Sequence, residues 1–239
     1  MPELPVLLCL PHAGGAASAF RRWETALDGV VRVVALEPPG RGARRAEPLA
    51  TSMGELVSAL RGPAIAAARL APRISLLGHS LGALVARELA DALAGAGLAP
   101  GLVIACGRNG PSEPNATEPI AGLSDEALLE SVVALGGVPP EVRSEPGLLT
   151  LFTEPLRADL AIAESWRRPP GMAPLRCPIR VLQGEDDPVV TPAGSAAWAA
   201  ETTAACAVST HAGSHFFLHA SGFAGATLRP LIAGWAHGR

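Results

Sequence analysis

Ser80 lies between two glycines in the run GHSLG at residues 78–82. A serine in this pattern, on a sharp turn from a strand into a helix, is typical of a nucleophile whose hydroxyl is exposed by a strained backbone. Residues 74–78 are predicted to form a short buried strand and residues 83–90 an apolar helix with one charged stripe. The alternative is a glycine-rich turn whose serine only caps the helix. The flanking elements favour the nucleophile.

A serine nucleophile needs a base, and the base needs an acid to orient it. Asp186 and Asp187 follow a predicted buried strand at residues 179–182, so they should lie at the same edge of the sheet as Ser80. Asp187 is favoured over Asp186 by its similarity to the acid of serine hydrolases, which stands three residues after the glycine and immediately before the Pro-Val turn. The alternative is a pair of solvated turn carboxylates.

The base is predicted to be His215, because the loop at residues 213–217 can bring an imidazole over the strand ends. His79 should project away from the serine, and His211 should end the last strand. The other histidines are His12, His219 and His237. The chain order of serine, aspartate and histidine is the order found in α/β-hydrolases.

The oxyanion of a tetrahedral intermediate needs two fixed backbone donors. One is predicted to be the amide of Leu81, which follows the nucleophile. The other is predicted to be the amide of Ala13, in the glycine-rich turn at residues 11–15. A phosphate-binding loop is the competing interpretation of that turn, but it lacks the Lys-Ser/Thr of a P-loop and the third glycine of a dinucleotide site.

The elements that position these residues alternate between strands and helices, which predicts an α/β fold with a mostly parallel sheet covered on both faces. Residues 1–239 are expected to form one domain. The predicted strands are 6–10, 31–36, 74–78, 102–106, 179–182 and 205–210. The predicted helices outside the middle of the chain are 20–27, 52–70 with an interruption or kink at Gly62-Pro63, 83–90, 192–201 and 223–235.

The alternation stops between residues 107 and 174, where no strand is predicted. Short amphipathic helices are expected instead at residues 125–135, 146–152 and 155–166. Helices this short need something to pack against. Residues 108–174 are therefore predicted to form an inserted helical lid, in which Phe152 and Trp166 are candidate substrate-binding residues. Further lid residues that could enclose an apolar group are Leu128, Leu129, Val132, Leu149 and Leu160.

The composition of the chain argues against several other classes of function. The net charge is −3 and the chain has no lysine, so no basic field favours nucleic acid or an anionic membrane. The four cysteines form no C-x-x-C pair and are expected to be free thiols. The N-terminus lacks the features of a signal peptide, and no apolar run is long enough for a membrane span. A cytoplasmic protein without a metal or redox cofactor is expected.

Several motifs together resemble the type II thioesterases of polyketide and nonribosomal peptide assembly lines. They are LCLPHAGG at residues 8–15, PGRG at 39–42, GHSLGA at 78–83, LSDE at 123–126, LGGVPP at 135–140, LRAD at 156–159, GEDDPV at 184–189 and SHFF at 214–217. They span nearly the whole chain in the right order. One departure is Leu81, where the family often has Met; its backbone amide is unaffected.

The resemblance implies a discrete, monomeric enzyme that hydrolyses acyl groups from the phosphopantetheine thioester of acyl or peptidyl carrier proteins. Two other functions use the same residues. A carboxylesterase or acyltransferase would share the triad but take other substrates. A catalytically silent hydrolase fold would act as a binding protein, although a complete triad argues against it.

Overall fold

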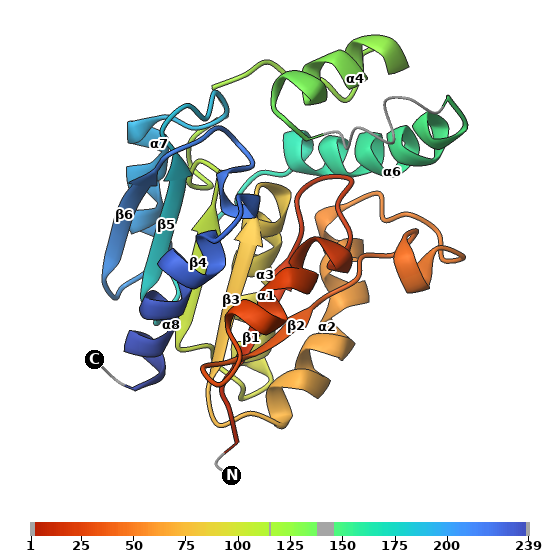
Figure 1. The fold of residues 1–239 in the computed structure, drawn as a ribbon. Helices are drawn as coiled ribbons and strands as arrows, with labels where there is room; N and C mark the ends of the chain where they lie inside the picture. Colours follow the sequence, from red (N-terminus) through yellow and green to blue (C-terminus); the bar gives the residue numbers. More distant parts are fainter. Residues whose placement is uncertain (1–2, 115, 138–145, 238–239) are drawn as a thin grey trace.

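The computed structural model of the chain describes residues 3–114, 116–137 and 146–237, and the side chains of residues 146–151 lie outside this description. A parallel sheet of six strands forms its centre (Figure 1), in the order β2-β1-β3-β4-β5-β6. The strands are β1 (Val6–Leu10), β2 (Arg32–Ala35), β3 (Ile74–His79), β4 (Leu102–Cys106), β5 (Ile179–Gly184) and β6 (Cys206–His211). This sheet confirms the predicted fold class, and His211 ends the last strand as expected.

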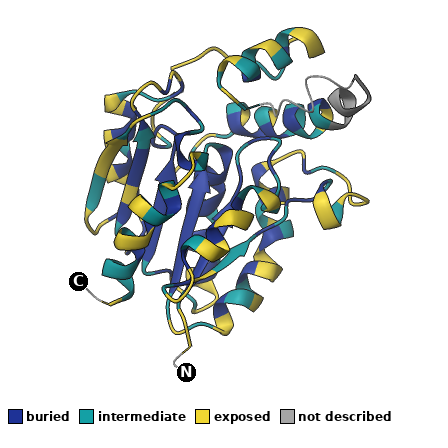
Figure 2. Cartoon of the chain, viewed as in Figure 1, coloured by how far each residue is buried: buried dark blue, intermediate teal, exposed yellow. Residues whose placement is uncertain are grey.

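Helices cover both faces of the sheet. Side chains on one face, such as Leu8 and Leu76, pack with α2 (Met53–Arg69) and α3 (Leu81–Gly95). Alternate side chains, such as Cys9 and Leu77, pack on the opposite face with α1 (Arg21–Ala26) and α8 (Arg229–Ala236). The central strands are therefore buried on both sides, which explains their continuous apolar sequences. Figure 2 shows this buried centre and the exposed outer surfaces of the helices.

Short helical segments complete the connections. They are η1 (Ala17–Phe20), η2 (Gly42–Arg44), α7 (Pro192–Ala196), η3 (Ala197–Glu201), η4 (Phe217–His219) and η5 (Ala224–Leu228). The segment η4 follows the loop that carries His215, and η5 continues directly into α8. The predicted helix at residues 192–201 is therefore split between α7 and η3.

Of the interruption or kink predicted at Gly62-Pro63, the interruption is wrong, because α2 is continuous from Met53 to Arg69 with Pro63 inside it. Proline has no amide hydrogen and cannot bond to the carbonyl four residues earlier. That carbonyl belongs to Ala59, and it accepts a hydrogen bond of 3.2 Å from the Arg44 guanidinium. A side chain distant in the sequence thus satisfies the group that proline leaves free.

The segment between β4 and β5 contains α4 (Asp125–Ala134) and α6 (Pro146–Ser165), and both lie above the carboxyl ends of the strands (Figure 1). Within the described part of residues 107–174 there is no strand. The prediction of two helices separated at Pro155 is wrong, because α6 runs through this proline. Leu156, Ile162 and Ala163 are almost fully buried, and their packing outweighs one lost helical hydrogen bond.

All four cysteines are free, as predicted. Across the described residues, none of the helices combines the length and the apolar character needed to cross a bilayer.

Candidate active site

Ser80 occupies a strained turn between β3 and α3. Its φ of 55° and ψ of −116° make it the sole non-glycine residue with positive φ in the described chain. A Cβ on Gly78 would lie 1.9 Å from the carbonyl oxygen of Gly82, and a Cβ on Gly82 would lie 2.3 Å from the carbonyl oxygen of Leu10. Both glycines are therefore needed for strand and helix to approach this closely, and the serine is held at the carboxyl edge of the sheet.

Asp187 and His215 meet at the same edge from the loops after β5 and β6. Nδ1 of His215 lies 2.9 and 3.0 Å from the two carboxylate oxygens of Asp187. Asp187 is buried and also accepts a hydrogen bond from the amide of Val189, whereas Asp186 is exposed. The structure thus brings Asp187, and not its neighbour, to the histidine.

Close contact between the two loops explains this pairing. The amide of Asp186 donates to the carbonyl of Gly213 at 3.0 Å. A Cβ on Gly184 would lie 2.5 Å from the carbonyl oxygens of Gly213 and Ser214, so only glycine fits at the end of β5. Gly213 itself has a φ of 115°, which a residue with a side chain rarely adopts. These glycines allow the acid and the base to face each other.

Ser80 and His215 line one cavity of about 530 Å³ beneath the helices of the β4–β5 segment. Among the described residues, no hydrogen bond joins the serine hydroxyl to the imidazole. Such bonds are often long in free enzymes and shorten in the substrate complex. The apolar part of the cavity wall includes Leu84, Val132, Leu156, Leu160, Trp166 and Phe216.

The two predicted oxyanion donors come from different elements, the turn after β1 and the start of α3. Leu81 is the first residue of α3, where amides have no acceptor within the helix and the helix dipole is positive. Ala13 follows β1 and lines the same cavity as Ser80. In the described parts of the chain, neither amide has a hydrogen-bond acceptor in the protein. Both amides are therefore free of acceptors within the described protein, as the predicted oxyanion role requires.

The two candidate lid residues differ in position. Trp166 lines the cavity, but Phe152 is not among the described residues that do. Phe152 lies one helical turn before Leu156 on α6, and it packs half-buried against the core. The cavity wall on the described part of α6 begins at Leu156, and the substrate-binding role of Phe152 stays a prediction. The side chain of Leu149 and residues 138–140 of the LGGVPP motif lie outside the described residues.

His79 has a structural connection to the site that the sequence did not reveal. Its ring is fully buried, and Nε2 lies 2.9 Å from the carbonyl oxygen of His215. Because a carbonyl only accepts, Nε2 carries the proton and donates it to this bond. The histidine of the GHSLG motif thus holds the backbone of the residue that faces Asp187.

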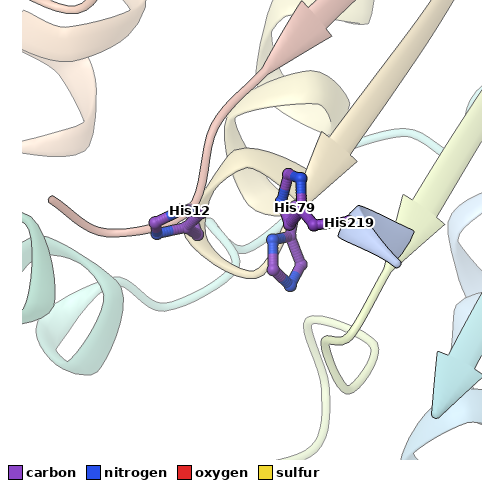
Figure 3. A group of neighbouring side chains, drawn as sticks. All are labelled: His12, His79 and His219. Carbon is purple, nitrogen blue, oxygen red and sulfur yellow. The ribbon is translucent and has the colours of Figure 1, made fainter. Parts of the chain in front are cut away.

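His79 belongs to a group of three histidines with His12 and His219 (Figure 3). Each ring offers one nitrogen within 4.8 Å of the others, and no other such group of three occurs in the described residues. These side chains could hold a metal ion, but two of the rings already use a nitrogen within the protein. His12 donates from Nδ1 to the carbonyl of Ala13 at 2.9 Å, and His79 donates to His215.

Burial keeps this histidine group uncharged. Desolvation, together with repulsion from the neighbouring histidines, lowers the pKa of His12 to about 3 and that of His219 to about 4. The same causes lower the pKa of His79 well below its usual value. A neutral group beside His215 does not oppose the positive charge that a catalytic imidazole acquires.

The low pKa values predict a loss of stability in acid. A histidine whose pKa is about 6.5 unfolded and about 4 folded binds its proton more readily in the unfolded chain. The free energy of unfolding should therefore fall by up to about 1.4 kcal/mol per pH unit for each such histidine below pH 6.5. Urea unfolding between pH 7 and pH 5 measures this slope. His219→Gln should reduce this slope by up to about 1.4 kcal/mol per pH unit, which corresponds to one proton, whereas the exposed His237→Gln should leave it unchanged. Equal slopes for His219→Gln and wild type would contradict the prediction.

A parallel α/β sheet with a strained serine after β3 and an Asp–His pair after β5 and β6 defines an α/β-hydrolase with the geometry of a serine hydrolase. The thioesterase domain family matches residues 5–232. The chain therefore belongs to the thioesterase family and is a thioester hydrolase.

Individual relatives agree with this assignment. A probable cadicidin biosynthesis thioesterase of Streptomyces griseus is 34% identical over 213 residues, which are 89% of this chain and 58% of the relative. Gramicidin S biosynthesis protein GrsT of Aneurinibacillus migulanus is 32% identical over 220 residues, covering 90% of this chain and 83% of the relative. The structure of the type II thioesterase BorB from the borrelidin biosynthetic cluster is similar with a TM-score of 0.86 and 35% identity, covering 99% of this chain and 94% of BorB.

Proposed function

We propose that Ser80, Asp187 and His215 are the catalytic triad of a type II thioesterase that removes acyl groups from carrier-protein phosphopantetheine. The main support for this proposal is the buried Asp187–His215 pair, whose histidine lines the same cavity as the strained serine. Relatives named for antibiotic biosynthesis support the carrier-bound substrate. We further expect the enzyme to act as a cytoplasmic monomer and to fold as one domain with a lid at about residues 108–174.

The geometry supports a two-step reaction. The Ser80 hydroxyl attacks the thioester carbonyl while His215 removes its proton, and Asp187 stabilises the imidazolium. The amides of Ala13 and Leu81 donate to the oxyanion. The tetrahedral intermediate then expels the phosphopantetheine sulfur, which receives the proton from His215. A water molecule, activated in the same way, releases the free acid and restores the serine.

The cavity suggests what is bound during this reaction. Its apolar wall can take an acyl chain, whereas Arg108, Glu113 and Glu118 line other parts of it. The lining residues come from the segment after β4, from the ends of the sheet and from α6. A long pantetheine arm could therefore reach Ser80 from the surface while the acyl chain packs beneath the helices.

The test is hydrolysis of a panel of defined acyl-carrier proteins, compared with simple esters of the same acids and with reactions containing an added alcohol or amine acceptor. We expect the highest kcat/KM on carrier thioesters and free acid as the product. Faster turnover of simple esters would favour a carboxylesterase, and transfer to the acceptor would favour an acyltransferase. Absence of turnover on every substrate would favour a binding protein.

Trp166 is expected to influence which acyl chains are accepted. Trp166→Ala should raise the ratio of kcat/KM for longer acyl chains to kcat/KM for shorter ones by about tenfold. The change is of this size because filling or emptying an apolar pocket alters binding by a few kcal/mol at most. A small activated ester should still react at close to the wild-type rate. Phe152→Ala, at the other predicted lid residue, should change the choice of acyl chain in the same assay. Equal losses on every substrate would contradict a role in selectivity.

A further inference from the structure

Arg41 and Asp159 form a buried ion pair that the proposed reaction does not use. Arg41 lies in the turn after β2, and Asp159 lies on α6. The guanidinium donates to both carboxylate oxygens at 2.5 and 2.9 Å, and the two residues are 8% and 2% exposed. A bidentate pair of this kind fixes both side chains in one geometry. Its position therefore links the β4–β5 segment to the body of the enzyme.

The same pair also holds the loop that carries Ala13. The amide of Gly14 donates to Asp159 at 2.8 Å, and Arg41 donates to the carbonyl of Gly15 at 3.2 Å. The carbonyl of Ala13 belongs to the same peptide group as the Gly14 amide, and it accepts a hydrogen bond from His12. In the Ala13–Gly14 peptide group, the carbonyl is thus held by His12 of the same turn and the amide by Asp159 of α6.

Packing leaves little room for this loop to shift. Gly14 has a φ of 73°, and a Cβ on it would lie 3.1 Å from Cβ and 3.2 Å from Cα of Leu156. Leu156 precedes Asp159 by one turn on the same face of α6. The backbone of the helix therefore rests directly on the loop, with the ion pair beside it.

We propose that Asp159 and Arg41 are positioning residues for the oxyanion site, so that α6 is a working part of the catalytic apparatus and not only a cover. The inference rests on the proposed function, because it takes the amide of Ala13 as an oxyanion donor. Asp159 orients the peptide that follows this amide, and Arg41 keeps Asp159 in place. Losing either contact should misplace the donor while leaving the acyl pocket intact.

The experiment compares Asp159→Asn and Arg41→Lys with wild type on a small activated ester and on an acyl-carrier protein. We expect kcat to fall by about 10²-fold on both substrates, because a small error in the position of a catalytic group lowers the rate by about this factor. KM should change by less than about twofold. A boronic acid that forms a tetrahedral adduct with Ser80 should bind more weakly by the same factor. An unreactive thioether analogue of the substrate should bind as it does to wild type.

Arg157→Gln is the matched control. Arg157 lies two residues from Asp159 on α6, and it pairs with Asp125 of α4 at 2.6 Å. It also donates to the carbonyl of Leu123 at 2.7 Å. This variant therefore removes a charged contact of α6 that does not touch the loop at residues 12–15. Its kcat on the small ester should stay within about twofold of wild type, far from the factor expected for a displaced oxyanion donor.

The proposal is overturned if both variants are folded by their thermal transitions and keep wild-type kcat, or if only KM rises. Should either variant fail to fold, hydrogen exchange of the wild-type enzyme gives the answer. Boronic acid binding should slow exchange in residues 12–16 and 152–165 together, and an effect confined to 12–16 would overturn the proposal. Failure of the proposed function is distinguishable in the wild-type enzyme, which would then either resist labelling of Ser80 by a fluorophosphonate or fail to hydrolyse the acyl-carrier protein.

Discussion

Ser80→Ala should lower kcat on an acyl-carrier protein by about 10⁴-fold or more and abolish labelling by a fluorophosphonate, since loss of a triad nucleophile removes covalent catalysis. The fold should be unaffected. Alanine carries the same Cβ as serine, so the substitution neither adds nor relieves strain at the turn, where φ is 55°. Rates of thioester hydrolysis and thermal unfolding of the purified variant measure both expectations.

Ser112→Ala provides the matched control for this variant. Ser112 also lines the cavity, but it lies in the segment after β4 and not in the turn between β3 and α3. Its substitution should leave labelling and the chemical step near wild type. Near-normal turnover by clean Ser80→Ala enzyme would show that another residue is the nucleophile.

Asp187→Asn should reduce kcat by roughly 10²- to 10⁴-fold, because His215 would lose the carboxylate that selects its tautomer and stabilises the imidazolium. Asp186→Asn should have a far smaller effect, since Asp186 is exposed while Asp187 is buried against Nδ1 of His215. Parallel measurements of kcat and KM on one acyl-carrier protein compare the two variants. The reverse order of effects would make Asp186 the triad acid and contradict the observed pairing.

The elements that carry the site were predictable because local rules decide them. Continuous apolar runs predict strands buried on both faces, and parallel strands bring the residues that follow them to one edge. Ser80 and Asp187 follow such strands, whereas β6, the strand before His215, is a partly exposed edge strand. The glycines at 78 and 82 are needed for a close approach of backbones, and the structure shows the contacts that any Cβ would make.

Residues that act through distant contacts were not predictable in the same way. Arg41 and Asp159 are separated by 118 positions, and nothing near either residue in the sequence indicates that they meet at Gly14. His79 was expected to point away from the serine, but no local pattern showed that it would bond to the backbone of His215.

Two errors have related causes. Proline predicts a break in a helix, yet Arg44 satisfies the free carbonyl in α2, and burial of Leu156 and Ile162 stabilises α6 after Pro155. In each case tertiary packing overrode a correct local expectation.

Substitutions in the segment between β4 and β5 should have one of two effects, depending on what the side chain contacts. Trp166 faces the cavity, so its substitution should alter the choice of acyl chain. Asp159 contacts the loop of Ala13, so its substitution should slow the chemistry on every substrate. Losses common to all substrates would therefore identify residues that support the oxyanion site, whereas selective losses identify those that contact the acyl chain.

The central claim is that Ser80 itself removes acyl groups from carrier proteins. The most direct test modifies Ser80 stoichiometrically with a fluorophosphonate, maps the adduct by peptide mass spectrometry, and then follows the intact mass of an acyl-carrier protein mixed with the modified enzyme. We expect the carrier to keep its acyl group, whereas the unmodified enzyme returns the carrier to the free thiol. Deacylation at the wild-type rate by enzyme fully modified at Ser80 would contradict this claim.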